Sequence, residues 1–187
     1  MFVCVPLYAA LGGRKPPLSL PVKASEPQGP RTIFAAAQHL ALPGGSRAVK
    51  SLLNVPGQMT YGQFVWNEEG VPPGKLWVRV DLARQTMSVF RGEYEIGTSV
   101  ILYGADEKRT PTGIFPILAR SAKHRSSLYD AEMPYTLRLT NDGVAIHGSD
   151  VRQGAATHGC IGVPLAFAAR LFANARQGDE VIVLPAA

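Results

Sequence analysis

The sequence predicts a mostly β domain with one helix, preceded by an N-terminal extension rich in proline and glycine. From residue 76 onward, apolar and polar residues alternate with a period of two, and turn signals separate these runs. Only one segment, 164–175, combines a proline in its first turn, an apolar stripe and a glycine just after its end. At 187 residues, with 46% hydrophobic and 18% charged residues, the chain suits one globular domain plus an extension.

The chain divides by composition into three parts. Residues 1–31 are predicted to be a remnant of an export signal followed by a flexible linker, because an apolar run precedes a stretch rich in Pro, Gly, Ser and Lys. Residues 32–74 are predicted to form a short segment of mixed helical and extended structure. The main domain is predicted to occupy residues 75–187, after a boundary rich in glycine and proline.

Within the N-terminal segment we predict a short helix over 32–42, a second helical turn over 48–53 and a strand over 63–66. In the main domain, strands are predicted over 76–82, 85–90, 95–103, 113–118, 135–139, 144–146 and 180–184. The Asn141-Asp142-Gly143 turn predicts a hairpin between the fifth and sixth of these strands. Residues 119–133 are predicted to be a long polar loop, which in a compact domain is usually functional.

One short stretch concentrates the reactive side chains. Cys160 follows His158 by two residues and His147 by thirteen, and glycines stand beside the two histidines at 148 and 159. Nucleophilic acyl transfer needs a thiolate, an imidazole that accepts and returns a proton, and backbone N–H groups that stabilise an oxyanion. This stretch supplies all three.

Other interpretations of the same stretch remain open. Cys160 could be a buried, inert thiol, because free cysteine is among the most buried residue types. His147, His158 and Cys160 could bind zinc, although their spacing matches no common zinc motif. A disulfide with Cys4 is a further alternative, although Cys4 belongs to the run that export would remove.

The Thr157-His158-Gly159-Cys160-Ile161 block, preceded by His147-Gly148, resembles the signature of the L,D-transpeptidase catalytic domain, which has the YkuD-like fold. The resemblance extends to three earlier segments and covers about residues 75–184; the segments are 110–115, 124–126 and 134–140. It implies a curved β-sandwich of antiparallel and mixed strands, with the catalytic loop beside the helix. One position departs from the family pattern: Gly162 stands where the family usually carries Arg or Asn.

The resemblance also implies roles for individual residues. Cys160 is the expected nucleophile and His147 the expected base, oriented by the backbone carbonyl of Gly148. The N–H groups of Gly159 and Cys160 are the candidates for the oxyanion hole. The candidates for shaping the loop and binding substrate are His158, Thr157, Tyr135, Arg138 and His124. For the strand residues Tyr135 and Arg138, sheet packing and surface charge are the alternative roles.

The expected substrate is the tetrapeptide stem of peptidoglycan, with an amine of a second stem as acceptor, no cofactor and no metal. A carbapenem is expected to form an adduct with the thiol. Hydrolysis of the thioester would instead give an L,D-carboxypeptidase. A general cysteine hydrolase and a non-catalytic wall-binding module are the remaining alternatives. Because the family acts outside the cytoplasm, the expected location is the periplasm or cell envelope.

Charge and hydropathy limit the classes of partner that the chain can bind. The formal net charge is +5, and no basic run is interleaved with aromatic residues, so nucleic-acid binding is not expected. No apolar stretch reaches the length of a membrane span, so no stable insertion of the mature chain is expected. For Gly162, we expect either altered substrate choice or a requirement for a positive φ angle.

Overall fold

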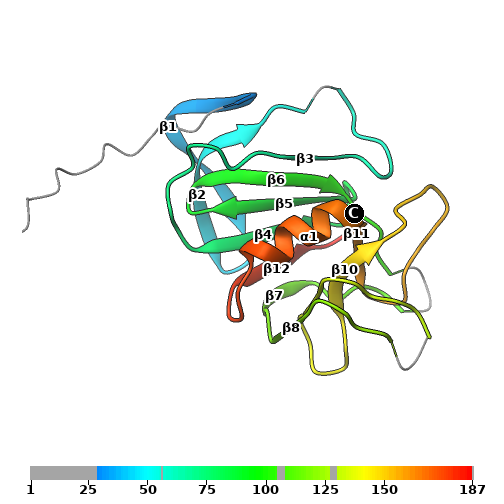
Figure 1. Cartoon of the computed structure of the whole chain (residues 1–187). Helices are drawn as coiled ribbons and strands as arrows, with labels where there is room; N and C mark the ends of the chain where they lie inside the picture. Colours follow the sequence, from blue (N-terminus) through cyan, green and yellow to red (C-terminus); the bar gives the residue numbers. More distant parts are fainter. Residues whose placement is uncertain (1–28, 56, 105–107, 127–129, 187) are drawn as a thin grey trace, which may run out of the picture.

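The computed structural model describes residues 29–55, 57–104, 108–126 and 130–186. Within them the chain forms two β-sheets and one helix, which confirms the predicted mostly β class (Figure 1). The predicted signal-like run, most of the predicted linker and Cys4 lie outside the described residues.

The larger sheet has the strand order β1-β2-β6-β5-β4-β12-β7, with β3 paired to β6. Its strands are β1 (Arg31–Leu42), β2 (Gly45–Leu53), β3 (Phe64–Trp66), β4 (Leu76–Asp81), β5 (Thr86–Arg91), β6 (Tyr94–Val100), β7 (Gly113–Pro116) and β12 (Glu180–Leu184). The alternating segment after residue 75 forms the expected antiparallel meander β4–β5–β6. The final strand, β12, inserts between β4 and β7, so the C-terminal end of the domain lies inside the sheet.

The smaller sheet carries the reactive residues. Its order is β11-β10-β9-β8, with β8 (Ala119–Ser121), β9 (Thr136–Arg138), β10 (Ala145–Ser149) and β11 (Ile161–Pro164). The predicted hairpin is confirmed, because β9 and β10 pair antiparallel on either side of the Asn141–Gly143 turn. Strands β8 and β11 were missed. Each is three or four residues long, and the 119–133 segment that begins with β8 has no alternating pattern.

The predicted helix is confirmed as α1 (Leu165–Asn174), with Pro164 at its N-cap. Phe167, Ala168 and Leu171 are buried in the core between the two sheets. Leu165, which the apolar stripe of this segment would place inward, is instead 54% exposed. Phe167 takes the inward position, and its ring meets the ring of Trp66 edge to face, with 5.4 Å between centroids.

The helices predicted over 32–42 and 48–53 are wrong, because both segments are strands. β1 and β2 pair antiparallel, and the sequence Pro43-Gly44-Gly45, which can also end a helix, forms their hairpin turn. Gly44 and Gly45 have φ angles of 80° and 134°, which only glycine adopts without strain. Alanine and leucine favour a helix locally, but antiparallel pairing with β2 and packing of Phe34, Leu40 and Leu42 on the sheet decide the outcome.

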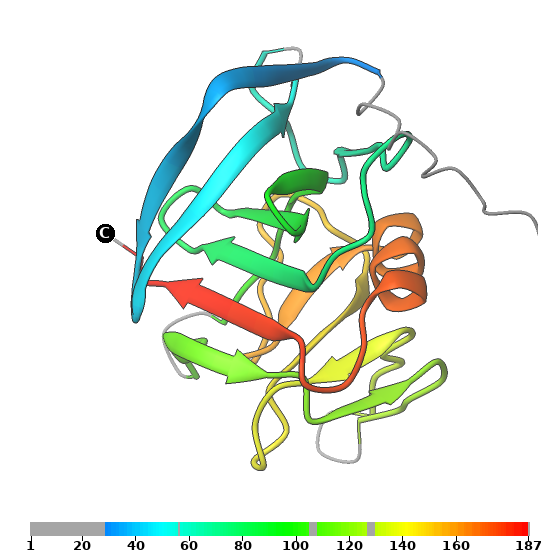
Figure 2. The same ribbon diagram turned by 90° about the vertical axis from the view of Figure 1, so that its left-hand side faces the viewer.

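The β1–β2 hairpin covers the outer face of the larger sheet, away from α1 (Figure 2). Beneath it, Trp77 and Phe90 stack with 4.1 Å between ring centroids and are almost fully buried. Apolar side chains of the hairpin, including buried Val49, pack on this pair. Arg31, predicted to belong to the linker, is instead buried and donates hydrogen bonds to Ser51 Oγ, the Glu95 carbonyl and the Asn67 carbonyl.

Candidate active site

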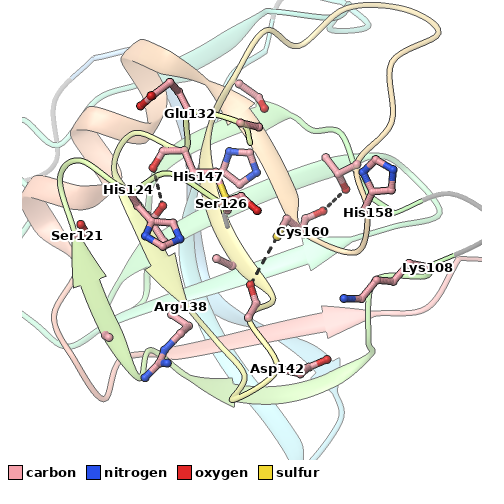
Figure 3. Close-up of a pocket in the computed structure, with 18 of the residues that line it drawn as sticks. Lys108, Ser121, His124, Ser126, Glu132, Arg138, Asp142, His147, His158 and Cys160 are labelled. Atoms are coloured by element: carbon pink, nitrogen blue, oxygen red, sulfur yellow. Dashed lines mark hydrogen bonds between the residues drawn. The ribbon is translucent and has the colours of Figure 1, made fainter. Parts of the chain in front are cut away.

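The period-two alternation of β10 directs its side chains to two sides. Ile146 points into the core, whereas Ala145, His147 and Ser149 line a cavity of about 760 Å³. β11 runs parallel to β10, with Ile161 opposite Ile146. Because Cys160 precedes Ile161 by one residue, its side chain falls on the cavity side together with His147, and it also lines the cavity (Figure 3).

The loop that carries Cys160 is held by its own backbone and by close packing. The hydroxyl of Thr157 donates to the carbonyl of Cys160, and the Thr157 N–H donates to the Tyr103 carbonyl. Gly159 has a φ angle of 96° and lies directly against Gly104, where a β-carbon would approach the Gly159 N and Cα to 2.7 Å. Thr157 and Gly159 therefore fix the position of the thiol, in addition to any role they have with substrate.

A backbone carbonyl orients the His147 imidazole. Nδ1 lies 2.9 Å from the carbonyl oxygen of Gly148, the partner expected from the family resemblance. Because a carbonyl can only accept, this bond requires the proton on Nδ1 and leaves Nε2 as a proton acceptor. Gly148 permits the close packing of this strand, because a β-carbon there would lie 2.9 Å from the Leu165 Cδ1 atom and 3.2 Å from the Pro134 Cγ atom.

Burial keeps both reactive groups neutral in the resting site. Burial lowers the pKa of His147. The hydrogen bond to the Gly148 carbonyl raises this pKa, and the charge of His124 lowers it further. Burial raises the pKa of the Cys160 thiol, the Ala145 N–H and Lys108 lower it, and Asp142 raises it. The thiol itself donates to the Gly143 carbonyl at 3.8 Å. The site thus pairs a neutral imidazole, able to take a proton, with a protonated thiol.

Most of the predicted substrate-binding residues do line this cavity. They are His124, Arg138, Thr157 and His158, all exposed except Thr157. Tyr135 is not among the residues that line it, which agrees with the alternative role of packing. Its φ angle of 57° turns the chain before β9, and its ring packs against Phe172 of α1 with 5.8 Å between centroids.

The cavity also contains charged residues that the sequence interpretation had not assigned to the site. Lys108 and Asp142 lie near Cys160, and Glu132 lies further out (Figure 3). Arg120 also lines the cavity. The hairpin turn could have indicated Asp142, because β10 pairs with both β9 and β11 and brings the turn tip beside the cysteine. No spacing in the sequence indicates Lys108, which reaches the site through tertiary packing alone.

Gly162 does not adopt a positive φ angle, so that explanation for the glycine is wrong. It lies in β11 opposite His147, and it exchanges both backbone hydrogen bonds with Leu102. A β-carbon at this position would lie 3.0 Å from the Ser149 Cβ and Oγ atoms and 3.4 Å from the Leu102 Cβ atom. Close approach of the neighbouring side chains therefore favours glycine.

Two further properties bear on the alternatives. Among the described residues, no group of three or more His, Cys, Asp and Glu side chains is arranged to hold a metal ion, so the zinc interpretation of residues 147, 158 and 160 finds no support there. Within the same part of the chain, no helix is long and apolar enough to span a bilayer.

A thiol and an oriented, neutral imidazole in one cavity of a mostly β domain form a site that can carry out nucleophilic acyl transfer. A family model of the L,D-transpeptidase catalytic domain (YkuD) matches residues 75–183. The match spans more than half of the sequence, and this chain belongs to that family of enzymes. Among curated proteins, none matches the chain.

Solved structures share the fold. The L,D-transpeptidase of Stackebrandtia nassauensis is 24% identical, with a TM-score of 0.56 over 60% of this chain and 56% of that chain. An L,D-transpeptidase of Mycobacterium smegmatis is 18% identical, with a TM-score of 0.57 over 82% of this chain and 80% of that one. The Ldtfm–avibactam carbamoyl enzyme is 19% identical, with a TM-score of 0.54 over 81% and 75%. The chain thus spans little more than half of the Stackebrandtia protein.

Proposed function

We propose that this chain is a cell-wall L,D-transpeptidase that cross-links or remodels peptidoglycan through a thioester on Cys160. The observation that carries the proposal is the shared cavity of Cys160 and His147, with the Gly148 carbonyl fixing the tautomer that leaves Nε2 basic. The family match supports the reaction class.

In the proposed first half-reaction, the Cys160 thiol gives its proton to His147 Nε2 as the sulfur attacks the carbonyl before the terminal D-residue of a stem peptide. The N–H groups of Gly159 and Cys160 are the candidate donors to the oxyanion. Collapse breaks the C–N bond, the leaving amine takes the proton from His147, and a thioester remains. A lowered pKa suits this step, because His147 must be neutral before it can act as a base.

In the second half-reaction, an acceptor amine loses a proton to His147 and attacks the thioester, and the thiol is restored. Water in place of the amine would make the enzyme an L,D-carboxypeptidase. Arg138 lies at the cavity edge on β9 and is exposed, which suits it to pair with a free carboxylate of the stem.

The decisive experiment incubates the protein with purified muropeptides and identifies the products by mass. Cross-linked dimers support transpeptidation and tripeptides indicate hydrolysis, whereas unchanged muropeptides contradict the proposal. Intact mass after carbapenem treatment should show one adduct, which Cys160→Ala removes and Cys4→Ala does not. An adduct that survives Cys160→Ala would show that the nucleophile is misassigned.

A matched pair of variants distinguishes the roles of His147 and His158. We expect His147→Gln to lower kcat by about 10²–10⁴-fold, the range for loss of a general base, and His158→Gln to have a smaller effect. His158 is exposed on the loop, whereas His147 is buried on a strand. A larger loss in the His158 variant would reverse the assignment.

We also propose that the protein acts in the periplasm or cell envelope, because its proposed substrate lies there. Fractionation of the native host followed by immunodetection tests this proposal. Recovery of the protein only in the cytoplasmic fraction would contradict it.

A further inference from the structure

Lys108 is held beside the cysteine loop by backbone packing. A β-carbon at Gly104 would lie 2.1 Å from the Lys108 carbonyl oxygen, and one at Gly159 would lie 3.4 Å from the Lys108 Cγ atom. The residue preceding the nucleophile therefore rests directly on Lys108. The Lys108 side chain extends into the cavity on the same side as Cys160 (Figure 3).

Asp142 is held on another side of the sulfur by the β9–β10 turn. The Cys160 thiol contacts the carbonyl of Gly143, the residue next to Asp142. The Thr140 hydroxyl hydrogen-bonds the Asp142 carboxylate within this turn at 2.5 Å, and both Lys108 and Asp142 line the cavity with Cys160. The cationic Lys108 thus packs against Gly159, the neighbour of the nucleophile. The anionic Asp142 is the neighbour of Gly143, whose carbonyl the thiol contacts.

The remaining titratable or charged side chains of the cavity are Arg120, His124, Glu132, Arg138, His147 and His158. Arg120 is committed to α1, where it covers the Phe172 ring and donates to the Phe172 carbonyl. Glu132 is paired with Arg125. The charge of His124 lowers the pKa of His147. The Lys108 charge lowers the pKa of Cys160 and the Asp142 charge raises it.

We propose that Lys108 and Asp142 are a pair of positioning residues of opposite sign, in which the Lys108 ammonium stabilises negative charge on the Cys160 sulfur and the Asp142 carboxylate opposes it. This inference rests on Cys160 being the nucleophile of the proposed function. The pair sets the reactivity of a thiol that burial alone would leave protonated.

The test measures alkylation of the sulfur by iodoacetamide, in which the thiolate displaces iodide and forms a carbon–sulfur bond. The full chain carries Cys4→Ala, so that only Cys160 reacts, and the rate is followed from pH 5 to 10 by intact mass. The variants are Lys108→Met, Lys108→Arg and Asp142→Asn, with Lys75→Met as the control, because Lys75 is exposed and does not line the cavity. Asparagine keeps an acceptor for the Thr140 hydroxyl.

At low salt and pH 7, Lys108→Met should slow alkylation by about three-fold, the size expected for one partly screened charge several ångströms away. Its pH midpoint should move upward, and the midpoint of Asp142→Asn should move downward with faster alkylation. Lys108→Arg and Lys75→Met should match the parent. The differences should shrink at 1 M NaCl, where the Debye length is only about 3 Å.

Three results would overturn the inference: unchanged profiles in both charge variants, shifts of the same sign in both, or equal slowing by Lys108→Met and Lys108→Arg. The last result would mean that the shape of Lys108 matters and its charge does not. If Lys108→Met unfolds, the direction of the Asp142→Asn shift still decides. Alkylation does not depend on peptidoglycan, so failure of the transpeptidase assay and failure of this inference are distinguishable.

Discussion

Gly162 offers the sharpest test of how the site is packed. Its backbone φ angle suits any residue, so substitution by alanine is limited by space alone. The new methyl carbon would lie 3.0 Å from the Ser149 Cβ and Oγ atoms. The Ser149 Cβ is attached to strand β10, so it can move away only if the backbone that also carries His147 moves.

Two opposing terms set the size of the effect. Overpacking a well-packed region costs about 1–3 kcal/mol, and Gly→Ala returns about 0.4–1 kcal/mol through the unfolded chain. We therefore expect Gly162→Ala to reduce the free energy of unfolding by about 1–2 kcal/mol, which lowers Tm by about 2–8 °C for a domain of this size. The longer Asn and Arg side chains usual in the family should cost at least as much here.

A double-mutant cycle identifies the cause. Ser149→Gly removes both crowding atoms and should restore most of the lost stability of Gly162→Ala, whereas Ser149→Ala keeps the β-carbon and should restore less. Urea unfolding of the single and double variants measures the coupling energy. Equal rescue by both Ser149 variants, or strict additivity, would refute the packing argument.

Two further predictions concern stability. The pKa of His147 is lowered in the folded state, so between its unfolded and folded pKa values the unfolded chain binds more protons. Tm should therefore fall as the pH drops from 7 to 5, and it should fall less steeply in His147→Gln. Equal slopes in the two proteins would contradict this prediction. The chain 57–187, which keeps β3 and lacks the β1–β2 hairpin, should melt well below the chain 29–187, because loss of the hairpin exposes Trp77 and Phe90, at about 1.5–3 kcal/mol each. Similar melting curves for the two chains would show that the hairpin is dispensable.

Local sequence was sufficient to predict the elements that have a strong, self-contained pattern. Period-two alternation predicted β4, β5 and β6, the Asn141–Gly143 turn predicted the β9–β10 hairpin, and the 164–175 pattern predicted α1. The same local information gave the wrong structure for β1. An alanine- and leucine-rich segment has no fixed preference until a neighbouring strand and a buried face select one.

The sequence by itself determined which residues have the chemistry for the site: a cysteine, a histidine on a strand, and glycines beside both. Only the tertiary structure decided which charges surround them. The parallel pairing of β10 with β11 places Cys160 beside His147, the hairpin turn brings Asp142 next to the sulfur, and the contact between Gly104 and Gly159 brings Lys108 to the cavity. Electrostatic effects depend on distance through space, and residues 108, 142 and 160 are separated in the sequence by intervals that carry no signal of that proximity.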